Sequence, residues 1–115
     1  MKILILGAGR VGSSLASTLS RENYDVSIID HNKDKLLRLQ EDFDLATVIG
    51  HASHPDTLVS AGADEETILL AVTSSDECNI AACQIAKSKF KVKKTICRLS
   101  DASYLDSLGA FGEGN

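Results

Sequence analysis

Several features that mark other classes of protein are missing from this sequence. Acidic and basic residues are interspersed and sum to a net charge of −4, which disfavours direct binding to nucleic acid or to an anionic membrane. The first apolar stretch, MKILIL, ends at a glycine and is too short for a signal peptide or a membrane span. The cysteines, 3 in number, form no paired framework and suit a reducing cytoplasm. We therefore expect a cytoplasmic protein with no nucleic acid partner and no direct membrane insertion.

The chain does contain five apolar runs that alternate with amphipathic segments. Its 115 residues hold no internal repeat or low-complexity linker and suffice for one core. Such alternation is typical of βαβ units around a parallel sheet. We expect strands at residues 2–6, 26–29, 45–49, 67–72 and 95–97. The prediction is therefore a single α/β domain, a doubly wound, Rossmann-like parallel sheet with strand order 3-2-1-4-5.

The segments between the strands predict helices, each with one buried face. The expected stripes are Val11, Leu15 and Leu19; Leu36, Leu39, Gln40 and Phe43; and Cys78, Ala81, Ala82, Ile85 and Ala86. Residues that favour helix ends are Asn32, Pro55, Gly62 and either Ser74 or Ser75. A last helix is expected over residues 104–108, ending at Gly109.

A glycine-rich turn directly follows the first strand. It reads Gly7-x-Gly9-x-x-Gly12, and it opens a helix. Gly7 allows the tight turn, Gly9 lets a pyrophosphate approach the backbone, and Gly12 permits close packing of helix on strand. The helix N-terminus offers unpaired amides and partial positive charge to the phosphates. The alternative is a turn that only packs a helix and binds nothing.

An acid ends the second strand, which strengthens the interpretation of the glycine turn. Asp30 lies 23 positions after Gly7, where its carboxylate can accept hydrogen bonds from the ribose hydroxyls of a dinucleotide. The same charge would repel a 2′-phosphate, so NADP is disfavoured. One alternative is that Asp30 only caps a turn, and another is an S-adenosylmethionine site, which uses a similar arrangement. The three-glycine spacing favours a dinucleotide.

Polar residues also follow the other strands at the expected cofactor edge. Thr73 and Ser74 can contact the dinucleotide, whereas Ser75 can simply cap a helix. Arg98 can neutralise a phosphate, or it can pair with Asp76 or Asp101.

Three histidines fall in loops after the second and third strands. His51 and His54 have H-x-x-H spacing, but no third or fourth ligand accompanies them, so no metal site is predicted. We expect His31, His51 and His54 to act as caps or as contacts at the edge of a nucleotide.

The sequence offers nothing from which to build a catalytic site. A dehydrogenase needs a proton donor or acceptor beside the nicotinamide and a second wall for its substrate. Cys97 lies within a strand and is expected to be a buried apolar residue rather than a nucleophile. We therefore predict a non-enzyme. The alternatives are the cofactor-binding half of a small NAD-dependent oxidoreductase and a structural oligomerisation domain.

Longer segments carry a family resemblance. GHASHP, VTSSDECNIAACQIAK and ICRLSDASYL, with the glycine turn, resemble N-terminal RCK (KTN) domains, and more narrowly those of regulators of bacterial Trk potassium uptake. The resemblance covers nearly all of the chain, so residues 1–115 would be one such domain. Because the family's proteins continue into further lobes, the chain would be a fragment of a longer protein.

The resemblance implies a nucleotide-sensing regulatory subunit. Such a protein binds NAD(H), or in relatives ATP or ADP, and forms a homo-oligomer, at least a dimer or tetramer. It would be peripheral at the inner face of the cell membrane, held by a potassium transporter subunit.

The motif and the resemblance together give a set of expected cofactor-binding residues. They are Gly7, Ala8, Gly9, Arg10, Val11, Gly12, Asp30, His31, Gly50, His51, Thr73, Ser74 and Arg98. Two of them depart from the family pattern: Arg10 stands where a neutral Gln is common, and Ser74 replaces a usual Asn.

Overall fold

A computed structural model describes residues 1–103 and consists of a parallel sheet between two layers of helices. The strands are β1 (Lys2–Leu6), β2 (Asp25–Asp30), β3 (Ala46–Ile49), β4 (Thr67–Ala71) and β5 (Lys94–Cys97). The helices are α1 (Arg10–Arg21), α2 (Lys33–Asp42), α3 (Pro55–Ser60) and α4 (Asp76–Lys89). Each predicted strand is present within two residues of its expected bounds.

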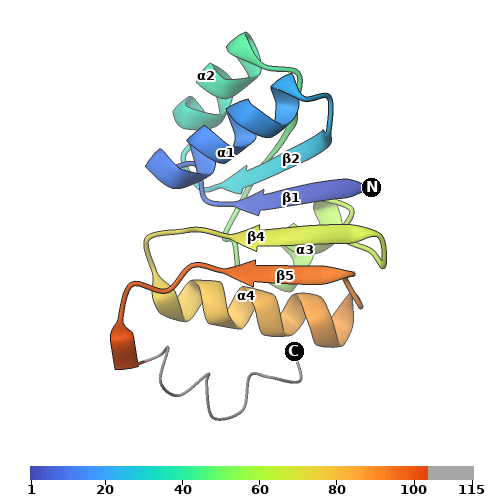
Figure 1. The fold of residues 1–115 in the computed structure, drawn as a ribbon, viewed down its shortest axis with the longest axis vertical. Coiled ribbons are helices and arrows are strands. Elements are labelled where there is room, and N and C mark those ends of the chain that lie inside the picture. Colours follow the sequence, from blue (N-terminus) through green and yellow to red (C-terminus); the bar gives the residue numbers. More distant parts are fainter. Residues whose placement is uncertain (104–115) are drawn as a thin grey trace.

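The strands are all parallel and lie in the order β3-β2-β1-β4-β5, which confirms the prediction of a doubly wound sheet. In Figure 1 the arrows of β1, β2, β4 and β5 point the same way, so the carboxyl ends of these strands meet at one edge. The chain crosses from one flank of β1 to the other between β3 and β4. Ligands of open α/β sheets bind beside such a switch point.

Side chains of successive residues in β1 point to opposite faces of the sheet and enter two separate cores. Leu4 and Leu6 pack with residues of α3 and α4, while Ile3 and Ile5 pack with residues of α1 and α2. Leu4, Ile5 and Leu6 have no exposed surface. Burial on both faces is the reason that a continuous apolar run, rather than an alternating one, forms this strand.

The buried face of α1 differs from the predicted stripe. Val11 is 37% exposed, and Leu15 and Leu19 are half-buried. The residues that face the sheet are instead the small ones, Gly12, Ala16 and Ser20. Small side chains let the helix lie close to the strands, so the leucines fill the flanks of the contact.

The buried faces predicted for α2 and α4 are partly wrong. Leu36 and Leu39 of α2 are buried and Phe43 is half-buried, but Gln40 is exposed. In α4 Ala82 and Ala86 are buried and Cys78 and Ile85 are half-buried, whereas Ala81 is exposed. The buried face of α4 also includes residues not predicted to lie there: Asp76, Asn79 and Cys83.

Most expected helix ends are confirmed. The Asn32 side chain accepts a hydrogen bond from the Lys35 amide (3.2 Å). Ser75 rather than Ser74 caps α4, accepting from the Cys78 amide (3.2 Å). Pro55 begins α3, and Gly62 follows its end with a φ of 76°. The helix predicted at residues 104–108, with its end at Gly109, lies outside the described residues.

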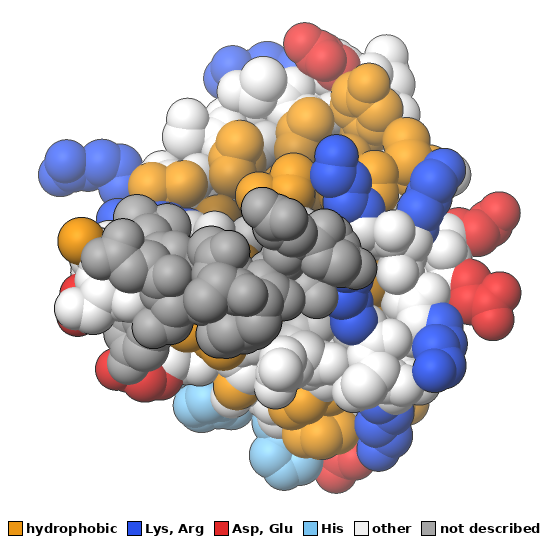
Figure 2. All heavy atoms as spheres, turned by 60° about the horizontal axis from the view of Figure 1, so that its bottom comes forward, with side chains coloured by type: hydrophobic (Ala, Val, Ile, Leu, Met, Phe, Trp, Pro, Cys, Tyr) orange, Lys and Arg blue, Asp and Glu red, His pale blue; other side chains and the backbone are white. Residues whose placement is uncertain are grey.

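The described surface carries both signs of charge. On the face shown in Figure 2, basic and acidic side chains are dispersed among polar and apolar ones. Within residues 1–103, no helix has both the length and the apolar character needed to cross a bilayer.

Candidate functional site

A cleft of about 650 Å³ lies at the carboxyl edge of the sheet, beside the switch point. It collects residues from the β1–α1 turn, the end of β2, the loops after β3 and β4, and the position after β5. The predicted residues that line it are Gly7, Gly9, Arg10, Val11, Asp30, His31, Gly50, His51, Thr73, Ser74 and Arg98. The fold therefore brings together residues that are up to 91 positions apart in the sequence (98 − 7).

The glycine turn presents backbone to this cleft. Gly7 adopts a φ of 103°, and its amide donates to the Ile29 carbonyl oxygen (2.8 Å). A Cβ built on Gly9 would meet no atom within 4 Å, so this position faces open space. Gly9 also caps α1 without any side-chain acceptor, which leaves the first-turn amides of the helix unpaired by a cap. This end of the helix is suited to an anion.

Two members of the predicted set, Ala8 and Gly12, do not line the cleft. The Ala8 amide donates to the Asp30 carboxylate (2.9 Å), so it is used inside the protein. Gly12 is buried, and a Cβ there would overlap the Gly7 carbonyl oxygen. Gly12 therefore permits close packing of α1, as predicted, but the nearest contact is the glycine turn rather than the strand.

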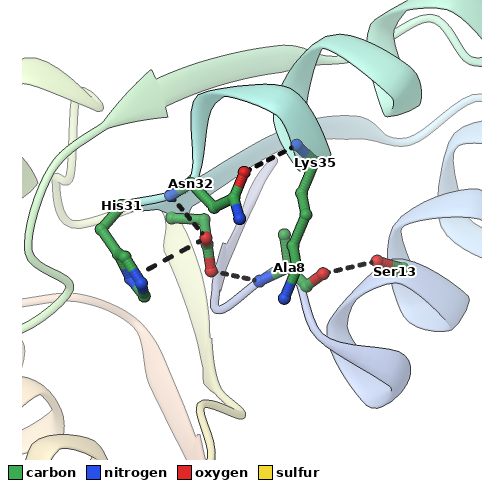
Figure 3. Close-up of polar contacts among 6 residues, drawn as sticks. Ala8, Ser13, His31, Asn32 and Lys35 are labelled. Carbon is green, nitrogen blue, oxygen red and sulfur yellow. Dashed lines mark hydrogen bonds and ion pairs between the residues drawn. The ribbon is translucent and has the colours of Figure 1, made fainter.

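Asp30 holds the glycine turn and the start of α2 together by binding the amides of Ala8 and Asn32, which Figure 3 labels. Only 9% of its surface is exposed. One carboxylate oxygen accepts from the Ala8 amide, and the other accepts from the Asn32 amide (2.8 Å). Asp30 therefore caps a turn and also fixes the glycine loop. Each oxygen of a carboxylate has a second acceptor site, which remains for a hydroxyl of a ligand.

Two further polar residues near Asp30, His31 and Lys35, line the cleft. The His31 side chain is 89% exposed, with Nδ1 3.9 Å from a carboxylate oxygen of Asp30. Lys35 also lines the cleft, and in Figure 3 its side chain runs from α2 toward the glycine turn. The sequence pattern did not indicate Lys35, because this residue lies beyond the motif and outside the predicted buried face of its helix.

The histidines of the H-x-x-H segment make separate contacts. His51 lines the cleft, and its Nδ1 is 3.0 Å from the Ser53 hydroxyl. His54 caps α3 by accepting from the Asp56 amide (3.2 Å). No group of three or more His, Cys, Asp or Glu side chains suited to a metal gathers within residues 1–103.

Gly50 follows β3 and connects that strand to the end of β2. Its amide donates to the Asp30 carbonyl oxygen (3.0 Å). A Cβ at Gly50 would come within 2.8 Å of Thr57 Oγ1, so this wall of the cleft is tightly packed.

The opposite wall is formed by the loop after β4 and the residue after β5. The Arg98 guanidinium donates to the Thr73 carbonyl oxygen over 3.5 Å. Among the described residues Arg98 forms no ion pair with Asp76 or Asp101. Asp76 instead accepts from the Ser100 amide and hydroxyl (3.0 and 3.1 Å) and from the Asp101 amide (2.9 Å). These hydrogen bonds, with a smaller effect of the Arg98 charge, hold the pKa of Asp76 below its usual value.

Several other residues that line the cleft were not among the predicted ones. Val72, Ser75 and Cys78 line the cleft, as do Ile29 and Ala52 on the other side. These residues carry no motif of their own, and only the positions of the strand ends could have indicated them.

The other two thiols lie away from the cleft lining. Burial and the neighbouring Cys97 raise the pKa of Cys83 to about 12. Cys97 was predicted to be buried but is only half-buried, and partial burial raises the pKa of its thiol. Because thiolates are the reactive form, neither residue is suited to nucleophilic chemistry at neutral pH.

Comparisons with known proteins give matches over nearly the whole chain. The model of the TrkA-N domain matches residues 3–113. The Trk system potassium uptake protein TrkA of Vibrio alginolyticus is 50% identical over 105 residues, which cover 91% of this chain and 23% of that protein. The chain thus spans less than a quarter of the length of this relative.

Solved structures share the fold. The Shewanella denitrificans Kef CTD in AMP-bound form matches with a TM-score of 0.80 at 23% identity, covering 97% of this chain and 67% of that one. The GsuK channel bound to NAD matches with a TM-score of 0.69 at 21% identity, covering 93% and 20%. At such identities these likenesses concern the fold alone. The TrkA-N model, in contrast, spans nearly the whole sequence, and this chain belongs to the TrkA-N domain family.

Proposed function

We propose that the cleft binds NAD(H), with ATP or ADP competing for the same site, and that the chain is the nucleotide-sensing part of a regulator of potassium uptake. One arrangement carries the proposal. The open backbone at Gly9, at the N-terminus of α1, faces the same cleft as the Asp30 carboxylate. These two groups match two parts of an adenosine diphosphate unit, its anionic diphosphate and the diol of its ribose.

Each wall of the cleft has a role in this proposal. The diphosphate lies against the amides at Gly9, Arg10 and Val11, and Asp30 accepts from the adenosine ribose. Arg98 contributes a positive charge from the opposite wall. The fixed charge of Asp30, whose side chain is almost buried, disfavours a 2′-phosphate, so NADP binds more weakly than NAD.

The biological role rests on the family and on the named relative. The Vibrio relative is a potassium uptake protein, and the two structural neighbours bind AMP and NAD. We infer a homo-oligomeric regulator that sits in the cytoplasm against a membrane potassium transporter. A ligand shifts such an assembly only if it binds two conformations with different affinities. NAD, NADH, ATP and ADP must therefore bind those conformations unequally.

Calorimetric titration of the purified chain with NAD, NADH, ATP, ADP and NADP tests the proposal. We expect binding of the first four and weaker binding of NADP. Asp30→Asn should weaken NAD binding by about tenfold, which corresponds to about 1.4 kcal/mol. Asp25→Asn is the matched control, because Asp25 is an exposed acid at the other end of the same strand. Absence of binding by every nucleotide at millimolar concentration would refute the proposal.

A second measurement separates a sensor from the cofactor-binding half of an oxidoreductase. The purified chain should not oxidise NADH in the presence of a panel of carbonyl compounds. Steady turnover that is lost in Asp30→Asn would favour the oxidoreductase instead.

A further inference from the structure

Asn79 is a fully buried polar residue outside the predicted set of cofactor-binding residues. It lies on the second turn of α4 with 0% of its surface exposed. The neighbouring buried positions of the helix, Ala82, Cys83 and Ala86, are apolar or weakly polar and belong to the core. A buried amide is costly unless all of its polar atoms find partners.

The partners of Asn79 come from both strands that end at this wall. Its Oδ1 accepts from the Thr73 amide (3.0 Å) and from the Thr73 hydroxyl (2.7 Å). Its Nδ2 donates to the Thr73 carbonyl oxygen (3.1 Å) and to the Arg98 carbonyl oxygen (2.9 Å). Thr73 follows β4 and Arg98 follows β5, so one side chain fixes two loops that are 25 positions apart.

The contacts of Asn79 act on the main chain of Arg98, not on its charged group. The Arg98 amide also donates to the Ala71 carbonyl oxygen (2.9 Å), so its backbone is held from both sides. Arg98 is exposed, and within residues 1–103 the one hydrogen bond of its guanidinium is the 3.5 Å contact with the Thr73 carbonyl oxygen. The base of this side chain is therefore fixed while its charged end is weakly held and can bind an anion.

Asp76, in the first turn of α4, also holds residues that follow β5. It lies about one turn before Asn79 and accepts hydrogen bonds from Ser100 and Asp101, which lie shortly after Arg98. Both buried polar residues of α4 thus hold the segment after β5. Neither lines the cleft.

We propose that Asn79 is a positioning residue for the nucleotide, which sets where Thr73 and Arg98 meet the ligand diphosphate. This inference rests on the proposed function. Asn79 does not touch the ligand. Asn79 fixes the wall of the cleft that is formed by the segments after β4 and β5, so ligand binding does not have to order two separate loops.

A double-mutant cycle with Arg98 tests this role, because a positioning residue acts through the group it positions. Affinity for NAD is measured by calorimetry for the wild type, Asn79→Ser, Arg98→Ala and the double variant. We expect each single change to weaken binding about tenfold. Because Asn79 also holds Thr73, the affinity of the double variant should lie between that of Arg98→Ala alone and the product of the two single effects. Multiplying effects, or an unchanged affinity in Asn79→Ser, would overturn the inference.

Controls separate positioning from stability. Ala86→Gly removes a buried side chain from the same helix, two turns away from Asn79, and should lower the melting temperature without changing NAD affinity. Asn79→Asp keeps the acceptor oxygens but sets a carboxylate against two carbonyl oxygens, and it replaces Asn79→Ser if that variant does not fold. Weak binding by Ala86→Gly at a matched melting temperature would also overturn the inference. Failure of the wild type to bind any nucleotide would instead refute the proposed function.

Discussion

The two walls of the cleft are built in opposite ways. The wall formed by the β1–α1 turn is backbone: Gly7 adopts a positive φ, Gly9 leaves open space, and Gly12 lies against the turn. The wall after β4 and β5 is held by side chains, with Asn79 and Asp76 each accepting or donating several hydrogen bonds. The first wall depends on the absence of Cβ atoms, and the second depends on buried polar groups that are fully paired.

This difference predicts different sensitivities to substitution. On the glycine wall the volume of a side chain decides the outcome, and two glycines three positions apart should respond in opposite ways. On the other wall the pattern of donors and acceptors decides, so substitutions of equal volume should be harmful. The following experiments test this contrast.

The largest effect is expected at Gly12. Replacing a glycine inside a helix by alanine ordinarily stabilises it by about 1 kcal/mol. At Gly12 the sign should reverse, because the new Cβ would overlap the Gly7 carbonyl oxygen. We expect Gly12→Ala to lower the unfolding free energy by about 2 kcal/mol or more, measured by urea denaturation. Ser14→Ala, at an exposed position of the same helix, should change it by less than about 0.5 kcal/mol. Equal stability of the two variants would contradict the packing described for α1.

Gly9 should show the converse behaviour. Its backbone, with φ −77° and ψ −161°, is accessible to alanine, and the added Cβ meets no protein atom. Gly9→Ala should therefore leave the unfolding free energy within about 0.5 kcal/mol of the wild type. It should weaken NAD binding at least about tenfold, because the methyl group occupies the approach of the diphosphate. Unchanged affinity would show that phosphates do not lie against this position.

The sequence predicted the glycine wall better than the other wall, for a physical reason. A backbone site needs glycine at fixed spacing, so Gly7, Gly9 and Gly12 are visible in the sequence itself. The strand order also followed from local patterns, because runs buried on both faces are continuous and apolar. Asp30 could be predicted because a strand end fixes its position.

Contacts across the sequence could not be predicted in the same way. In the sequence Asn79 is only a polar residue near the start of a helix. Its burial follows from the way the segments after β4 and β5 lie side by side around its amide. The stripe of α1 was assigned to leucines since hydrophobicity marks buried faces. Because α1 lies close to the sheet, only small side chains fit between them, and Ala16 is buried there instead.

A smaller effect is expected in acid. Hydrogen bonds from Ser100 lower the pKa of Asp76 below 3.8, and hydrogen bonds from Glu66 and Thr67 lower that of Asp64. A carboxyl with a depressed folded-state pKa contributes stability that is complete above its unfolded value. That contribution is lost as pH falls through the folded value, so both groups stabilise the fold at neutral pH and less below about pH 4.

The two acids lie at opposite ends of β4, which separates their effects. Asp76→Asn and Asp64→Asn should each flatten the acid side of a plot of urea midpoint against pH. Only Asp76→Asn should also speed hydrogen exchange at the amides of Ser100 and Asp101, since those amides donate to Asp76. Unaltered exchange at both amides would mean that Asp76 does not hold the segment after β5.

The smallest effect concerns the thiols, which report on the cleft without altering it. Cys78 and Cys97 are both half-buried, but only Cys78 lines the cleft. Saturating NAD should slow alkylation of Cys78 several-fold and leave Cys97 unchanged, as read by mass spectrometry of peptides. Cys83 should react slowest in either case, because burial raises its pKa to about 12 and leaves little thiolate. Equal protection of Cys78 and Cys97 would indicate general stiffening of the fold, whereas selective protection of Cys78 places the ligand between the two walls.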